Sequence, residues 1–225
     1  MNYLLVVAHP DDEVLGAGAT IAKLVTEGHN VDVCVMCSNA QARNMRPSDS
    51  ELNDDMHNCL SVLGVNKIFK GDFPNIKMNN SDHLELVKFI ESAIVVCQPD
   101  VIITHHACDT NNDHLHTSLA CQAAFRIFQR KSDFKPISEL WYMETLSSTD
   151  WAVNTAMNTF NPNLFVEIGR GGVQKKIAAL SLYRDVMRPY PHPRSEESIL
   201  GLAAYRGSQS GCCYAEAFEC AFRRM

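Results

Sequence analysis

Two short clusters hold most of the side chains that could do chemistry. The first is His9-Pro10-Asp11-Asp12-Glu13, which directly follows the apolar run Tyr3 to Ala8. Three consecutive carboxylates repel one another at the mouth of a hydrophobic strand, and a helix N-terminus offsets only ~0.3–1 kcal/mol of that repulsion per charge. A divalent cation would offset far more, although the same residues could also form an ordinary solvated helix start. His9, in the same cluster, favours the interpretation as a metal site.

The second cluster runs from Thr104 to His116 and contains four histidines and two aspartates. Histidine is neither a good core residue nor a strong turn former, so packing does not explain this density. Catalytic zinc typically takes three protein ligands from His and Asp or Glu and leaves a fourth position for water. His9, one aspartate of the first cluster and one histidine of the second would complete such a set. Composition alone does not say which histidine.

The elements that must position these clusters alternate between short β-branched runs and helix-length amphipathic segments, a pattern typical of parallel βαβ units. Strands are expected at Tyr3 to Ala8, Val31 to Ser38, Lys67 to Lys70, Asp100 to Thr104, Glu139 to Glu144 and Leu164 to Ile168. Helices are expected at Asp12 to Glu27, Asp49 to Leu63, Ser81 to Cys97, His114 to Arg130 and Val173 to Tyr183, followed by a helical C-terminal third. The pattern predicts a single α/β domain over residues 1–225, with a Rossmann-like three-layer α/β/α fold.

A mostly parallel sheet of order near 3-2-1-4-5 would make the first and fourth strands neighbours. The gap beyond their carboxyl ends is the topological switch point where such sheets bind ligands, so both clusters are expected in one crevice. Arg43 and Arg46 follow the second strand at the same edge, where a guanidinium could hold a phosphate or sugar hydroxyl, or simply lie in solvent. His192, in a proline-stiffened loop, is a third candidate for substrate binding, with turn structure as the alternative.

Composition excludes several classes of protein. The chain has 26 acidic and 20 basic side chains and a formal charge of −6, without the Lys and Arg cluster that nucleic-acid binding requires. Lys23 is the first basic residue, so no secretory signal is expected, and no apolar run approaches the ~18 residues of a membrane span. Gly16 and Gly18 lack the third glycine of a dinucleotide fingerprint.

The nine cysteines indicate the compartment. They are scattered singly through apolar segments, which suits a reducing environment, so a cytoplasmic location is expected. Cys34 and Cys37 have the spacing of a redox motif but lie in an expected strand, where residues three apart point to opposite faces. They are expected to pack in the core.

The segment from Ala8 to Glu13, with Asp109-x-Asn111-x-Asp113-His114 downstream, resembles the PIG-L (LmbE-like) family of zinc-dependent N-deacetylases, which act on N-acetylglucosamine-type sugars. The resemblance extends to Leu63-Gly64-Val65, Arg206-Gly207 and Tyr214-Ala215-Glu216-Ala217-Phe218. It implies metal ligation by His9, Asp12 and His114 and a general base at Asp11. It also implies Zn²⁺ or another divalent metal such as Fe²⁺, a small amino-sugar or glycoconjugate substrate, and a homo-oligomer, either trimer or hexamer.

Metal chemistry agrees with these implied roles. Zinc lowers the pKa of bound water from 15.7 to ~7, so a neighbouring carboxylate can take its proton, and the metal stabilises the oxyanion that follows. Asp113 is expected to orient neighbouring groups. Many family members carry a histidine where this chain has Asn111, which donates a hydrogen bond but cannot shuttle a proton. The leaving amine would then be protonated by Asp11, or by another residue such as His192 or His116.

Two other hypotheses stay open at this point. A metal-dependent amidase or hydratase could keep the same ligands on the same fold and change the substrate. A non-catalytic, metal-stabilised binding protein is the second, and the presence of Asp11 argues against it. Release of acetate with a free amine separates a deacetylase from a hydratase.

Overall fold

A seven-stranded sheet forms the centre of the computed structural model, which describes residues 1–39, 47–153 and 159–225. The predicted substrate residues Arg43 and Arg46 lie outside the described residues. The strand order is β3-β2-β1-β4-β5-β7-β6. The strands are β1 (Asn2–Val7), β2 (Asn30–Val35), β3 (Ile68–Lys70), β4 (Val101–His105), β5 (Glu139–Met143), β6 (Leu164–Glu167) and β7 (Ala215–Arg223).

The first five strands confirm the predicted sheet. They pair in parallel in the order 3-2-1-4-5, so the fold is Rossmann-like α/β. β7 then pairs antiparallel with both β5 and β6. The prediction of a helical C-terminal third is therefore wrong for Ala215–Arg223. Alanine and glutamate favour a helix there by a few tenths of a kcal/mol per residue, and pairing on both edges of the strand outweighs so small a preference.

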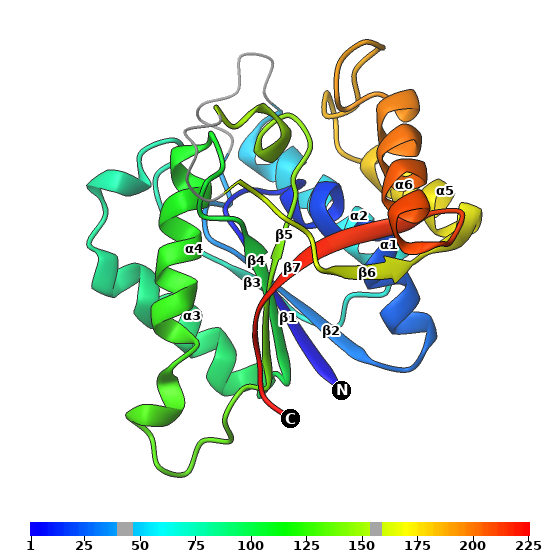
Figure 1. Ribbon diagram of the computed structural model, residues 1–225. Helices are drawn as coiled ribbons and strands as arrows, with labels where there is room; N and C mark the ends of the chain where they lie inside the picture. Colours follow the sequence, from blue (N-terminus) through cyan, green and yellow to red (C-terminus); the bar gives the residue numbers. More distant parts are fainter. Residues whose placement is uncertain (40–46, 154–158) are drawn as a thin grey trace.

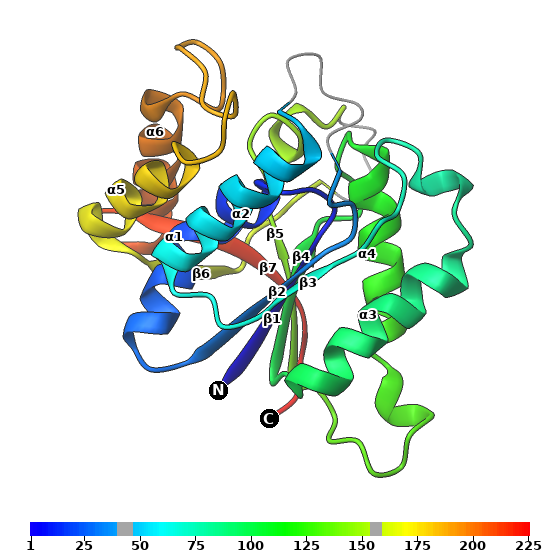
Figure 2. The same cartoon turned by 180° about the vertical axis from the view of Figure 1, so that it is seen from behind.

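Helices cover both faces of the sheet, which gives the predicted three layers (Figures 1 and 2). On one face lie α1 (Asp12–Thr26), α2 (Asp49–Leu63), α5 (Gly169–Leu180) and α6 (Glu196–Ser210). On the other lie α3 (His83–Cys97) and α4 (Asn112–Ala124). Short 3₁₀ turns occur at Met78–Asn80, Ile127–Gln129 and Thr149–Trp151. The helix expected to reach Arg130 thus ends at Ala124, with a separate 3₁₀ turn beyond it.

Alternating side chains of β1 divide the core in two. Tyr3, Leu5 and Val7 pack toward α1, α2, α5 and α6, whereas Leu4 and Val6 pack toward α3 and α4. Both faces are buried, as expected for a central parallel strand.

Cys34 and Cys37 are fully buried, as predicted for core thiols. The expectation that they face opposite sides is wrong. Both pack on the α3 and α4 side, because β2 ends at Val35 and Cys37 lies beyond the regular strand.

Helix α1 is interrupted at Ala17, where φ is −143°. The carboxylate of Glu216 on β7 accepts hydrogen bonds from the backbone N–H groups of Ala19 and Thr20, at 3.2 and 2.6 Å. Lys176 on α5 donates to the same carboxylate at 2.7 Å. Glu216 therefore caps the second half of α1 as though a new helix began there. None of the helices in the described ranges is both long and apolar enough to cross a membrane.

Candidate active site

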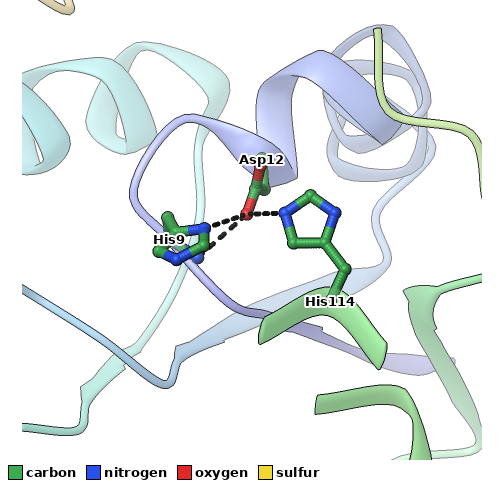
Figure 3. Close-up of side chains that lie close together, drawn as sticks. All are labelled: His9, Asp12 and His114. Carbon is green, nitrogen blue, oxygen red and sulfur yellow. Dashed lines mark hydrogen bonds and ion pairs between the residues drawn. The ribbon is translucent and has the colours of Figure 1, made fainter. Parts of the chain in front are cut away.

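Three predicted metal ligands meet beyond the carboxyl ends of β1 and β4. His9 and Asp12 follow β1, and His114 lies in the first turn of α4. One ligand atom from each lies within 4.8 Å of the others, and all three side chains are buried. Figure 3 shows His9 and His114 approaching the Asp12 carboxylate from either side. The parallel strand order produces this meeting, because it makes β1 and β4 neighbours.

Asp113 orients the ring of His9. His9 Nε2 lies 2.9 Å from Asp113 Oδ2, and that carboxylate also accepts the backbone N–H groups of Ile76 and Met78, at 2.6 and 3.0 Å. Because the Asp113 carboxylate is an ionised acceptor, the ring proton of His9 lies on Nε2. His9 Nδ1 is then left with its lone pair 3.3 Å from Asp12 Oδ2.

Asp109 holds His114 in the same way. Its Oδ2 lies 3.0 Å from His114 Nδ1, and its carboxylate also accepts from the hydroxyls of Ser148 and Thr149. Asp109 belongs to the second sequence motif, but its position there did not predict this role. The sequence signal for this role is an aspartate five residues before His114, in the loop that leads into α4. The loop turns at this point, where Asp109 Oδ1 accepts the backbone N–H of Asn111 at 2.8 Å.

The donor set fits a divalent cation. His114 Nε2 is buried and makes no hydrogen bond of acceptable geometry within residues 1–39, 47–153 and 159–225, yet it lies 3.1 Å from Asp12 Oδ2. With the proton held on Nδ1 by Asp109, two lone pairs face each other at this contact. Such an arrangement is repulsive unless a proton or a metal ion stands there. Two imidazoles and one carboxylate form a ligand set that catalytic zinc uses.

Without a metal, protonation of His114 balances the negative charge of the neighbouring carboxylates. Burial by itself lowers the pKa of His114, but the carboxylates of Asp12 and Asp109 outweigh it and raise that pKa to about 10. Burial likewise opposes ionisation of Asp12, and His114 and His9 nevertheless hold its pKa well below the usual range. The pocket therefore strongly favours positive charge between these carboxylates.

His105 supports the site from behind. Its ring stacks on that of His114 with centroids 3.7 Å apart, and its Nε2 accepts the backbone N–H of Ala8 at 2.9 Å. Burial and the neighbouring His114 lower the pKa of His105 to about 3, so its ring is neutral. His106 lies farther off, against Tyr142 and Phe160, with its Nε2 3.5 Å from Glu219.

Asp11, the predicted base, adopts a left-handed backbone conformation with φ of 101°. Asp11 lines the cavity described below, and Arg194 Nη1 lies 3.4 Å from its Oδ2. Behind it, Glu13 is fully buried and accepts hydrogen bonds from the Asp11 N–H and the Tyr183 hydroxyl, at 3.1 and 2.6 Å. Burial, opposed by the Tyr183 hydrogen bond and aided by Asp11, raises the pKa of Glu13 to about 8.

A cavity of about 610 Å³ opens over these residues, within the ~300–1,000 Å³ range of small-molecule sites. The side chains that line it are His9, Asp11, Asp12, Asn75, Ile76, Thr110, Asn111, His114, Ser147, Ser148, Asp185, Arg188 and Arg194. Asn111 Oδ1 caps α4 by accepting the N–H of Asp113 at 2.9 Å. His192 is not among the lining residues and lies edge-on to Trp151, whereas Arg194, two residues later, does line the cavity.

Comparison with known proteins gives the family. The sequence profile of PIG-L, described as GlcNAc-PI de-N-acetylase, matches residues 4–125, more than half of the 225-residue chain. The chain belongs to the PIG-L family. The PIG-L match spans both clusters, including all three predicted metal ligands.

Similar proteins agree with this assignment. The uncharacterized deacetylase YaiS of Escherichia coli (strain K12) is 24% identical over 189 residues, covering 80% of this chain and 89% of YaiS. The N,N'-diacetylchitobiose deacetylase of Pyrococcus horikoshii superposes with a TM-score of 0.77 at 20% identity, covering 97% of this chain and 82% of that one. The 4-carboxy-2-hydroxymuconate hydratase GalB of Pseudomonas putida KT2440 superposes with a TM-score of 0.75 at 21% identity, covering 100% and 98%. The PIG-L match and the YaiS relative indicate hydrolytic N-deacetylase activity.

Proposed function

We propose that this protein is a divalent-metal-dependent hydrolase that removes the N-acetyl group from an N-acetylglucosamine-type sugar or glycoconjugate. His9, Asp12 and His114 would hold the metal, Zn²⁺ in the first instance and Fe²⁺ as the alternative. The observation that carries the proposal is the buried contact of 3.1 Å between His114 Nε2 and Asp12 Oδ2, where two lone pairs would repel each other unless a proton or a metal ion lay between them. A cation relieves that repulsion and accounts for the convergence of the three side chains.

When bound, the cation would supply Lewis acidity, lowering the pKa of water toward ~7 and neutralising charge on a carbonyl oxygen. The protein's own base would be Asp11, whose carboxylate lines the same cavity. Asp11 would take the proton of the water that attacks the acetamide carbon. It would then return that proton to the leaving amine as the carbon–nitrogen bond breaks.

Two neighbours support this assignment of the base. Arg194 approaches the Asp11 carboxylate and also donates from Nε to Ser147 Oγ at 2.8 Å, which fixes the guanidinium. Asn111 uses its Oδ1 to cap α4, so its NH₂ group is the side available to donate to substrate. Because an amide cannot transfer a proton, Asn111 would bind substrate or an oxyanion, and the proton of the amine falls to Asp11.

The cavity supports a small polar substrate. Arg188 and Arg194 line it, and we propose that they contact sugar hydroxyls or an attached anionic group in preference to His192. Arg43 and Arg46 stay as further candidates. Cys34, Cys59, Cys97 and Cys121 are free thiols buried in the core, which supports our proposal of a cytoplasmic location. A trimer or hexamer stays a prediction.

A metal-dependent hydratase is the alternative that the comparisons favour most. GalB is a hydratase and superposes on this chain about as well as the chitobiose deacetylase does, so likeness of fold does not separate the reactions. The family profile favours deacetylation.

A substrate panel tests the proposal. The protein loaded with Zn²⁺, and in parallel with Fe²⁺, is incubated with N-acetylated free sugars, nucleotide sugars, thiol glycosides and lipid-linked glycans. We expect at least one substrate to yield acetate and a primary amine in equal amounts, and chelation to stop the reaction until metal is restored. Turnover that survives verified metal removal, or addition of water to a substrate without acetate release, would contradict the proposal.

A further inference from the structure

The backbone of Asp11 needs an explanation that the metal site does not provide. Its φ of 101° lies in the left-handed region, which residues other than glycine rarely adopt. Asp11 occupies the N-cap position of α1, yet its side chain does not cap the helix. Asp11 lines the cavity instead, and Nη1 of Arg194, another lining residue, lies 3.4 Å from its Oδ2. Some contact must hold the peptide in this conformation.

One such contact is with the carboxyl group of Glu13, while the Asp11 C=O accepts the backbone N–H groups of Val14 and Leu15 in α1. Glu13 Oε2 accepts the backbone N–H of Asp11 at 3.1 Å, and Glu13 Oε1 accepts the hydroxyl of Tyr183 at 2.6 Å. Glu13 is 0% exposed and Tyr183 is 2% exposed. One carboxyl group thus ties the peptide of the base to a side chain 170 residues away in the sequence.

An ordinary helix-start role does not account for this arrangement. Acidic residues in a first turn gain from the helix dipole while exposed to water. Glu13 is instead fully buried and accepts hydrogen bonds from two specific partners. A fully buried acidic side chain is rare without such a partner. One partner, Tyr183, follows α5 and lies two residues before Asp185 and five before Arg188, which both line the cavity.

We propose that Glu13 and Tyr183 are a positioning pair that holds Asp11 in its productive conformation. The inference rests on the proposed function, because it assumes that Asp11 is the base. Tyr183 orients Glu13, Glu13 holds the Asp11 peptide, and the left-handed turn aims the Asp11 carboxylate into the cavity. The pair acts through Asp11 and does not touch substrate.

Variants of the metal-loaded protein separate positioning from folding. Tyr183→Phe deletes only the hydroxyl, and we expect kcat to fall about tenfold with KM and bound metal unchanged within twofold. Tyr3→Phe is the matched control, because Tyr3 is also buried but its hydroxyl donates, among the residues that the structure describes, only to Met1 Sδ, at 3.8 Å. Its kcat should equal that of the wild type.

Substitutions at Glu13 give the complementary test. Glu13→Gln keeps an acceptor for the Asp11 N–H, so kcat should stay within about threefold of wild type. Glu13→Met removes the acceptor, and because a misplacement of ~1 Å can cost ~10²-fold in rate, kcat should fall by about that factor. If Glu13→Met does not fold, the loss of kcat in Tyr183→Phe and its retention in Glu13→Gln still test the positioning role.

A crystal structure of metal-loaded Glu13→Met, or of Tyr183→Phe in its place, supplies a readout that needs no substrate. We expect Asp11 to leave the left-handed region or its carboxylate to turn out of the cavity. An Asp11 that keeps its conformation, or wild-type kcat in Tyr183→Phe and Glu13→Met, would overturn the positioning role. A wild-type protein that releases no acetate would instead overturn the proposed function, while the conformation of Asp11 would still test the pair.

Discussion

His9 and His114 each bind a carboxylate with one ring nitrogen and direct the other toward Asp12. Asp113 and Asp109 supply those carboxylates, and each is itself fixed by further donors. The two rings are therefore oriented before any metal arrives, which reduces the reorganisation that binding requires.

Substitution of Asp109 tests this orientation. Asp109→Asn removes the charge that holds the Nδ1 proton of His114, so we expect metal affinity or activity to fall about 10–100-fold. Competition with a chelator of known affinity measures the loss. Asp133→Asn, at an exposed position away from the site, is the control and should bind metal as the wild type does. Equal affinity in the two variants would show that Asp109 does not support the ligand.

The sequence alone could predict the residues that share a recognisable spacing. Two compact clusters and their meeting at neighbouring strand ends could be predicted from the residues, whereas the choice of His9, Asp12 and His114 within them came from the resemblance to the PIG-L family. Asp109 and Glu13 were missed as supporting residues, because their roles depend on partners at Ser148 and Tyr183 that no local pattern relates to them. His192 and Arg194 lie two residues apart in one loop, and only the loop's conformation shows that Arg194 lines the cavity.

Among the elements, α1 and α6 show how β7 shapes the fold. The carboxylate of Glu216 on β7 caps the second half of α1, and the turn before β7 lies against α6 at Gly207. A Cβ atom at Gly207 would come within 2.6–2.7 Å of the backbone of Cys213 and Tyr214. Glycine is therefore needed here for close approach of two backbones, not for an unusual φ.

Two substitutions in α6 test this contact. Gly207→Ala should destabilise the protein by about 1–3 kcal/mol, because backbone atoms cannot move aside as a side chain can. Gly201→Ala, in the same helix with nothing within 4 Å of its Cβ position, should be neutral or stabilise by up to ~1 kcal/mol through helix propensity. Denaturant unfolding measures both. Equal effects would mean that α6 and the β7 turn do not pack as described.

The elements that sequence could predict are those with strong periodicity and clear ends. Helix α2 has the predicted bounds, since Ser48 forms a capping box with Glu51 and Gly64 ends the helix with φ of 82°. Strand β7 could not be recognised locally, because its alanines and glutamates favour a helix and its strand conformation comes from β5 and β6 on either side.

For the whole molecule, the proposed metal site couples the stability of the fold to pH. In the folded, metal-free protein the pKa of His114 is about 10, whereas in the unfolded chain it is near 6.5. Protonation of His114 therefore stabilises the folded state. That stabilisation is fully present below about pH 6.5 and is lost as the pH rises toward about 10. A metal ion must displace the same proton, so metal affinity should rise by up to about tenfold per pH unit over this window.

Thermal unfolding with and without Zn²⁺ checks this coupling. Free metal at ~1,000 times its dissociation constant should stabilise the fold by ~4 kcal/mol, and roughly 2–4 °C in Tm is expected per kcal/mol at this chain length. The increase in Tm at a fixed metal concentration should be larger at pH 8 than at pH 6. An increase that is independent of pH would mean that no proton leaves the site on binding.

The central claim is that Asp11 acts as the base at a metal held by His9, Asp12 and His114. The most direct measurement compares acetate release and bound metal for the wild type and Asp11→Asn on the best substrate of the panel. We predict a fall in kcat of ~10²–10⁴-fold, the usual contribution of a general base, with metal content unchanged. An Asp11→Asn protein that holds its metal and releases acetate at the wild-type rate would contradict the account.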